Sequence, residues 1–456
     1  MMKNLAILLV TIALFSCKEE IKPTYVVFEG NVENNSAEPA MIFGNDFEIK
    51  IPISDTGTFS DTLDIDIDGF YTLRIGREST SIYLIKNSNF AVKLDAKEFD
   101  ETLLYSGDVA SENNYLAAKY LLSEKEMSFS DVFKMSESDF LKEISVYKDN
   151  YIKLLNESLY LSETFIELES KELEYAHIMN LENYPGYYIY LTSDKSFKVS
   201  ESFYGSIKDI NFKDTIAFRN SHGYQKMLLT HYGRLSDENS GLEKYNKTVS
   251  FLKNVDFNLP NGYAKDNLMS KFLTYNLKAD ESLEEAYNLY INANPNSENL
   301  PKITENYNLL KNLTLGNKSP TFDYENHKGG TTSLNDLKGK YVYVDVWATW
   351  CGPCKREIPY LKEVEMEYHD KNIAFVSISI DVKKDHDTWI KMVDDKDLAG
   401  VQLFADNDWK SKFVTDYGIK GIPRFILIDD EGNIVNSDAP RPSNSDLRDV
   451  LESLDF

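Results

Sequence analysis

Two cysteines in the last third of the chain are the residues best suited to chemistry. Cys351 and Cys354 flank Gly352 and Pro353, where the apolar segment 341–346 gives way to a sequence typical of a helix. A sulfur at the start of a helix faces unpaired backbone N–H groups and the positive end of the helix dipole, which favour the thiolate. We therefore predict that Cys351 is the accessible nucleophile of a redox dithiol, and that the more buried Cys354 closes a disulfide on it.

Cysteines with this spacing can also form half of a zinc site, but such a site needs two further ligands. The chain has one other cysteine, Cys17, and its six histidines include no closely spaced ligand pair. Attachment of a c-type haem would require a histidine directly after Cys354, where Lys355 stands. Redox chemistry of the thiols themselves, with no metal and no cofactor, is therefore favoured over a metal site or inert thiols.

The first residues of the chain indicate where this chemistry takes place. A short start with one positive charge precedes an apolar run over 5–15, which predicts a signal peptide over 1–16 that is too short to span a membrane. Ser16-Cys17 resembles the lipobox of bacterial lipoproteins, which implies that Cys17 becomes the acylated first residue and that 17–24 is a tether. An ordinary cleaved signal or a chance apolar start is the alternative. Acylation would anchor the chain stably in the cell envelope.

The composition limits the partners of the chain. With 74 acidic and 49 basic residues, the net charge of −25 argues against binding to nucleic acid or to anionic lipid surfaces. Contact with a membrane must then come from the lipid anchor. A length of 456 residues predicts two or three domains, and 42% hydrophobic residues predict that they are folded throughout.

Residues 25–108 carry short β-rich runs separated by turn signals, and they predict a small antiparallel β-sandwich. The expected strands lie at 25–30, 47–51, 70–75 and 81–85. Through Asp55–Phe59 and Gly107–Asn114, this region resembles the N-terminal β domain that precedes thioredoxin modules in lipoproteins of the Bacteroidetes.

Apolar residues recur at helical spacing in the middle of the chain. The pattern predicts an all-α domain of roughly six to nine helices over 109–312. Its tyrosine-rich segment 184–190 is interpreted as core and helix packing, with a binding surface as the alternative.

Residues 317–456 predict an α/β domain with a parallel βαβ unit. Strands are expected at 341–346 and 373–380 on either side of the Cys-x-x-Cys helix. A charged helical insertion at 381–395, a hairpin at 425–435 and a last helix at 445–454 should follow.

The motifs of this third region resemble the thioredoxin fold. Trp347–Lys355 (WATWCGPCK) and Tyr417–Pro423 (YGIKGIP) match the two sides of its active site. The entry at Pro320–Phe322, the insertion, Glu357 before Pro359, and Arg441–Ser443 resemble the membrane-associated TlpA/ResA branch. The resemblance covers about 140 of the 456 residues.

That resemblance implies a substrate-binding surface around the dithiol. The Ile422–Pro423 peptide bond is expected to be cis and to face the cysteines, so that a substrate strand can pair with the backbone of Ile422. Besides these two residues, the predicted substrate-binding residues are Trp350, Gly352 and Pro353.

Two carboxylates are candidates for proton transfer. Asp345 stands where thioredoxins have a buried acid beneath the second cysteine, and burial should raise its pKa so that it can accept the proton of Cys354. An exposed position on an edge strand is the alternative. Glu357 is the second candidate, with a solvated role on the helix surface as its alternative. Ser377 stands where thioredoxins have a lysine near the acid.

Taken together, the sequence predicts a lipid-anchored, three-domain thiol–disulfide oxidoreductase of the cell envelope. The Gly-Pro pair between the cysteines is that of reducing thioredoxins, which favours a reductase. Disulfide-containing envelope proteins, apocytochromes among them, are the expected substrates, and an integral membrane thiol reductase is the expected electron donor. Lys18 after Cys17 favours the outer membrane over the inner one, with surface exposure open. The alternatives are an oxidase or isomerase, or a binding lipoprotein whose thioredoxin module is secondary.

Overall fold

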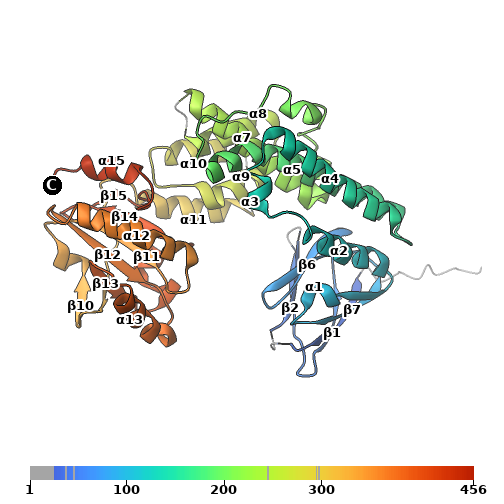
Figure 1. Ribbon diagram of the computed structural model, residues 1–456, viewed down its shortest axis with the longest axis horizontal. Coiled ribbons are helices and arrows are strands. Elements are labelled where there is room, and N and C mark those ends of the chain that lie inside the picture. Colours follow the sequence, from blue (N-terminus) through green and yellow to red (C-terminus); the bar gives the residue numbers. More distant parts are fainter. Residues whose placement is uncertain (1–24, 36–37, 45–46, 244–245, 294, 296–297) are drawn as a thin grey trace, which may run out of the picture. The chain divides into compact units, whose positions relative to one another are not determined.

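The computed structural model describes residues 25–456, except 36–37, 45–46, 244–245, 294 and 296–297 (Figure 1). The predicted signal peptide and Cys17 lie outside the described residues. No helix in the described part of the chain is long and apolar enough to cross a membrane.

The chain divides into two compact units. The described residues up to Ile210, together with Ile216–Met227, form the first unit, and Asn211–Thr215 with Leu228–Phe456 form the second. The boundary runs through helix α7 (His222–Glu243), so the helices predicted as one separate domain are shared between the two units.

Two four-stranded sheets form the β part of the first unit. One has the order β4-β1-β7-β8 and the other β3-β2-β5-β6. Their buried side chains belong to a single hydrophobic core, in keeping with a sandwich. The strands of the first sheet are β1 (Val26–Glu33), β4 (Thr58–Leu63), β7 (Asn89–Asp95) and β8 (Leu104–Gly107). Those of the second are β2 (Ala40–Gly44), β3 (Phe47–Ile51), β5 (Gly69–Ile75) and β6 (Glu78–Leu84).

The prediction of a purely antiparallel sandwich is wrong in one place. Strands β1 and β7 are parallel neighbours, with Phe28 opposite Phe90. Parallel strands need a long crossover connection. The whole second sheet lies between them in the sequence and supplies it.

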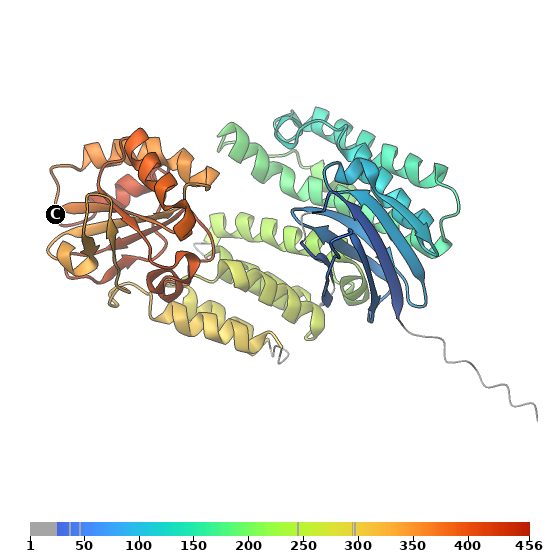
Figure 2. The ribbon, with the colours of Figure 1, turned by 90° about the horizontal axis from the view of Figure 1, so that it is seen from below.

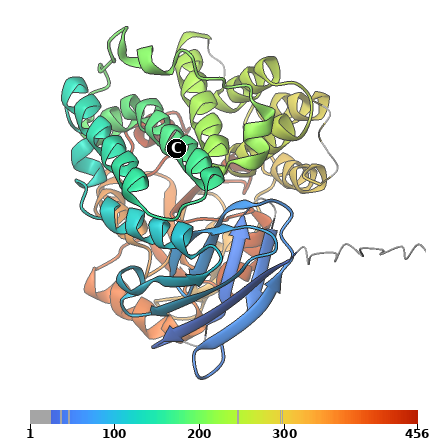
Figure 3. The ribbon, with the colours of Figure 1, turned by 90° about the vertical axis from the view of Figure 1, so that its right-hand side faces the viewer.

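Helices follow the strands in the chain, and the teal ones lie beside the blue strands in Figures 2 and 3. They are α1 (Phe99–Thr102), α2 (Ala110–Ser123), α3 (Phe129–Val132), α4 (Glu137–Glu157), α5 (Glu163–Thr192) and α6 (Thr215–Asn220). The amide of Asn113 in α2 exchanges two hydrogen bonds with the backbone of Tyr83 in β6, at 2.7 and 3.0 Å. Phe165 of α5 packs edge-on against the ring of Tyr83, with 5.0 Å between centroids. These contacts explain why the first helices join the sheets in one unit.

The tyrosine-rich segment lies in the second half of α5 and is divided between core and surface. Tyr184 is fully buried and stacks on Phe140 of α4, with 3.9 Å between ring centroids. Tyr187 and Tyr190 are exposed. The core interpretation therefore holds for Tyr184 alone among these three.

The second unit joins helices to a seven-stranded sheet. Helices α8 (Lys247–Asn258), α9 (Tyr263–Asn276), α10 (Leu283–Asn292) and α11 (Leu300–Lys311) precede the sheet in the chain. The strand order is β10-β9-β13-β12-β11-β14-β15. The strands are β9 (Asp323–Asn326), β10 (Thr331–Ser333), β11 (Tyr341–Trp347), β12 (Ile373–Ser379), β13 (Val401–Phe404), β14 (Arg424–Ile428) and β15 (Ile434–Asn436).

The predicted βαβ unit is confirmed. Strands β11 and β12 are parallel, and α12 (Gly352–Glu367) connects them. Six of the seven residues of β11 are buried, as expected for a central strand covered on both faces. The remaining helices are α13 (His386–Asp395), which is the predicted insertion, α14 (Lys412–Asp416) and α15 (Asp446–Glu452).

Candidate active site

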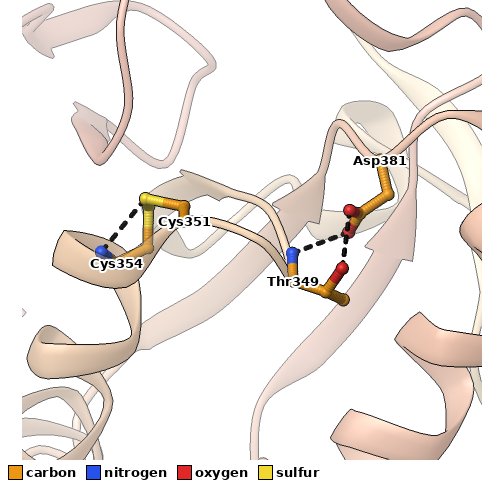
Figure 4. The surroundings of a disulfide bond; sticks show 4 residues. All are labelled: Thr349, Cys351, Cys354 and Asp381. Carbon is orange, nitrogen blue, oxygen red and sulfur yellow. Dashed lines mark hydrogen bonds between the residues drawn. A yellow bond between two sulfur atoms is a disulfide. The ribbon is translucent and has the colours of Figure 1, made fainter. Parts of the chain in front are cut away.

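The two cysteines of the motif are joined by a disulfide at the start of α12 (Figure 4). Cys351 is the residue before the first turn of the helix, and the backbone N–H of Cys354 donates a hydrogen bond to its Sγ at 3.1 Å. The exposed fraction is 3% for Cys351 and 4% for Cys354. The predicted difference in accessibility is therefore absent from this oxidised form.

A buried acid fixes the loop that carries Cys351. Both oxygens of Asp381 accept hydrogen bonds from Thr349, one from the backbone N–H at 2.9 Å and one from the hydroxyl at 2.8 Å (Figure 4). The hydroxyl of Ser379 donates a third bond to Asp381 at 2.7 Å. This clamp ties the loop after β11 to the segment after β12.

Sequence reasoning missed this clamp. It placed Asp381 at the start of a charged insertion and gave Thr349 no role. The available signal was an acid directly after an apolar strand, where a charge can remain buried only if it is well paired.

Asp345 is buried at the centre of the sheet, which excludes the exposed edge position. It lies in β11 and pairs with Ser377 of β12 on one side and Phe425 of β14 on the other. Burial raises the pKa of Asp345 to about 8, and the nearby negative charges of Glu357 and Glu365 add to the shift. Its Oδ1 has no hydrogen-bond partner among the described residues.

A cavity the size of one water molecule lies beside Asp345. Its volume is about 10 Å³, and Glu365 of α12 and Gln402 of β13 contribute to its lining. Burial raises the pKa of Glu365 to about 7. The Oε1 of Gln402, like Asp345 Oδ1, is buried without a partner among the described residues. The cavity therefore brings together two acids that titrate near neutral pH and a buried acceptor.

Glu357 is buried rather than solvated. Its two oxygens accept hydrogen bonds from Ser443, one from the backbone N–H at 3.0 Å and one from the hydroxyl at 2.9 Å. The side chain thus ties α12 to the segment before α15. Its negative charge adds to the effect of burial in raising the pKa of Asp345.

The Ile422–Pro423 peptide bond is cis, as the resemblance implied. It directly precedes β14, in which Arg424 is paired with Val346 at the end of β11. This register places Pro423 at the end of the sheet where the loop to Cys351 begins.

A comparison with family models matches residues 315–437 to the AhpC/TSA family. These residues hold the disulfide and every strand of the second unit, from β9 to β15. The C-terminal part of the chain is an AhpC/TSA-type thioredoxin-like domain.

Known thiol–disulfide oxidoreductases resemble this thioredoxin-like domain. The thiol-disulfide oxidoreductase ResA of Bacillus thuringiensis is 28% identical over 142 residues, which cover 31% of this chain and 79% of that protein. The solved thioredoxin domain of a thiol-disulfide oxidoreductase from Bacteroides vulgatus is 33% identical, with a TM-score of 0.28, over 31% of this chain and 96% of that one. A thiol:disulfide interchange protein from Bacteroides sp. is 32% identical, with a TM-score of 0.28, over 31% and 90%. The protein is an oxidoreductase enzyme that uses thiol–disulfide chemistry.

The residues that were predicted to bind substrate are all at least partly exposed on the thioredoxin-like domain. Trp350 is 55% exposed, and its ring centroid lies 6.5 Å from that of Trp409. Pro353 is exposed, and Gly352, Ile422 and Pro423 are partly exposed.

Within the described residues, no group of three or more His, Cys, Asp or Glu side chains could hold a metal ion.

Proposed function

We propose that this protein is a lipid-anchored reductase of the cell envelope that reduces disulfides of envelope proteins through Cys351 and Cys354. The observation that carries the proposal is the disulfide between Cys351 and Cys354 at the first turn of α12 in a thioredoxin-like domain. The names of the similar proteins support the reaction class.

Each turnover moves two electrons. In the reduced enzyme, the Cys351 thiolate attacks one sulfur of a substrate disulfide, forms a mixed disulfide and releases the other substrate sulfur as a thiol. Cys354 then attacks the Sγ of Cys351, which restores the intramolecular disulfide and releases the second substrate thiol. The enzyme is oxidised, and the substrate is reduced by the same two electrons.

Asp345 is proposed to accept the proton that Cys354 loses in the second step. Its pKa of about 8 is close to the roughly 8.5 of an ordinary cysteine thiol, so a proton can pass between them at little cost in free energy. The water-sized cavity and Glu365 offer a route for that proton away from the buried carboxyl. Glu357 tunes Asp345 through its charge.

The remaining parts of the proposal rest on the sequence. Acylation of Cys17 would hold the enzyme in the envelope, with the outer membrane favoured by Lys18. An integral membrane thiol reductase would supply electrons, and oxidised apocytochromes or misoxidised envelope proteins would receive them. Metal and nucleic acid have no part in the proposed reaction.

A trapping experiment in cells that make the full chain tests this function. The Cys354→Ser variant lacks the resolving thiol, so we expect it to accumulate mixed disulfides with envelope proteins, while Cys351→Ser accumulates none. The reduction potential of the purified dithiol should lie near those of reducing thioredoxins, roughly −270 mV. A potential near −120 mV, typical of strong oxidants, would instead make the protein an oxidase.

A further inference from the structure

The first unit contains a cavity that the dithiol chemistry does not use. Its volume is about 620 Å³, within the range of small-molecule sites. Strands β2, β5 and β6 form one wall, and helices α2, α4 and α5 with the start of α7 form the other. All of its lining residues belong to the first unit.

Aromatic side chains make up much of the lining. Phe43, Phe70 and Tyr71 come from the sheet, and Tyr120, Tyr147 and Tyr151 come from the helices. Aromatic faces bind the apolar body of a ligand, and they also attract a cation placed over the ring.

A buried carboxylate in the cavity lining lacks one hydrogen-bond donor. Glu169 of α5 is fully buried, and its Oε1 accepts hydrogen bonds from Lys119 at 2.6 Å and from the hydroxyl of Tyr115 at 3.0 Å. Its Oε2 is buried and has no partner among the described residues. An unpaired buried acceptor of this kind is costly unless a ligand supplies an N–H or O–H group.

The charges around Glu169 favour a positive ligand. Glu172, one turn further along α5, also lines the cavity. Burial raises the pKa of its carboxyl, whereas a hydrogen bond from Ser221 and the charge of Lys119, which pairs with Glu169, act in the opposite direction. Lys119 therefore interacts electrostatically with both carboxyl groups. Lys148 is paired with Glu174.

The other ionisable lining residues do not reverse this balance. Burial lowers the pKa of His177 and favours its neutral form. Glu126 is partly buried and accepts a hydrogen bond from Tyr151, and His222 and Lys226 are exposed. In the buried part of the cavity, Lys119 is thus the one cation near the two carboxyl groups of Glu169 and Glu172, among the described residues that line it.

We propose that this cavity binds a small organic cation, namely a protonated amine on an apolar or aromatic body. The ammonium group donates to Oε2 of Glu169, and the body packs against the tyrosine and phenylalanine rings. This site is separate from the thiol–disulfide reaction of the second unit, because all of its lining residues lie in the first.

Three probes of one shape test the proposal by titration calorimetry on the full chain at pH 7. They are 2-phenylethylamine as the cation, 2-phenylethanol as the neutral donor and 3-phenylpropanoate as the anion. A charge-assisted hydrogen bond should make the amine bind about tenfold more tightly than the alcohol, with the anion weakest. Equal binding of the three probes, tightest binding of the anion, or no binding of the amine would overturn the proposal.

A matched pair of variants locates the charge. Glu169→Gln should weaken amine binding about tenfold and change alcohol binding less than about twofold. Glu167→Gln is the control, because it removes a carboxylate from the exposed face of the same helix, where Glu167 pairs with Lys171. Equal loss in both variants would contradict the assignment of Glu169.

A third variant keeps the test decisive if Glu169→Gln fails to fold. Ala176 is an exposed residue of α5 that lines the cavity, so Ala176→Trp should fill the space without touching the ion pair. It should weaken binding of the amine and of the alcohol about tenfold, and unchanged amine binding would refute the site. Insulin reduction by each folded variant should stay at the level of the unmodified protein, which separates this proposal from the proposed reductase function.

Discussion

Each unit of the protein buries a carboxylate with one oxygen that lacks a hydrogen-bond partner among the described residues. Asp345 lies in the central strand of the second unit, where the nearby charges that act on it are negative and its pKa rises to about 8. Glu169 lies in a helix of the first unit, where Lys119 and Tyr115 both donate to it. We therefore propose different roles for the two carboxylates, proton exchange for Asp345 and an ionic contact for Glu169.

The neighbours of each carboxylate account for this difference. A buried acid without a cation stays neutral over a wide pH range and becomes a usable proton acceptor near its shifted pKa. A buried acid with a lysine partner keeps its charge, and its free lone pairs can attract a second donor. Replacing Asp345 should therefore raise the free energy of unfolding, whereas replacing Glu169 should lower it.

The largest effect is expected at the sulfur that defines the second unit. Cys351→Ser should lower the rate of insulin reduction by a factor of about 10³ or more, because a hydroxyl does not replace the thiolate as the attacking group. The assay is insulin turbidity with dithiothreitol as the electron source. Retention of more than about a tenth of the activity would show that Cys351 is not the nucleophile.

Asp345→Asn should slow turnover and stabilise the oxidised fold. General acid–base catalysis contributes about 10²–10⁴-fold, so a loss at the lower end, about 10²-fold, is expected in release of the substrate. The expected signature is a lower rate of resolution of a glutathione mixed disulfide at pH 7. An unchanged rate would remove Asp345 from the proton transfer.

The stability of the same variant should depend on pH in a defined way. Well below pH 3.8, Asp345 is protonated in both the folded and the unfolded chain, so its ionisation does not change the free energy of unfolding. Between pH 3.8 and about 8, the unfolded chain ionises first, so the free energy of unfolding of the wild type falls as the pH rises. Urea melts of the oxidised proteins should show the advantage of Asp345→Asn growing over this window and then levelling off.

Glu365→Gln provides the control for that pH dependence. The pKa of Glu365 is raised to about 7, so its own contribution should end near pH 7 rather than pH 8. Coincident windows for the two variants would mean that the acids titrate as one coupled pair.

Glu169→Ala should act in the opposite direction. Removing this carboxylate leaves Lys119 and the hydroxyl of Tyr115 without their shared acceptor, which should lower the free energy of unfolding by about 2–4 kcal/mol. Glu167→Ala, at an exposed surface pair, should change it by less than about 1 kcal/mol. Stabilisation by Glu169→Ala would contradict the contrast between the two buried acids.

The sequence predicts those parts of the fold that depend on residues close together in the chain. The apolar run of β11, the helix start at Cys351 and the hairpin from β14 to β15 are each specified by a few consecutive residues, and each lies where it was predicted. The burial of Asp345 was expected from the resemblance to thioredoxins, since the apolar strand alone left an exposed edge position open.

The contacts that the sequence does not reveal join distant residues. The clamp between Thr349 and Asp381 spans 32 positions, and the bond from Ser443 to Glu357 spans 86. The parallel pairing of β1 with β7 depends on a crossover through a whole sheet. The contacts of Asn113 and Phe165 with Tyr83 of β6 are likewise not indicated by helical periodicity.

The smallest predicted effect concerns the loop beside the dithiol, where Thr349 donates hydrogen bonds to Asp381. Thr349→Val removes the hydroxyl that donates to Oδ1 of Asp381, while the backbone N–H can still donate to Oδ2. Because Asp381 is buried and keeps its bond from Ser379, we expect a loss of about 1–2 kcal/mol in the free energy of unfolding. Insulin reduction should fall only a few-fold, since Cys351 keeps its place at the helix start. Thr349→Ser, which restores a hydroxyl, should recover most of both quantities, and failure of this recovery would show that packing of the methyl group, rather than the hydrogen bond to Asp381, positions the loop.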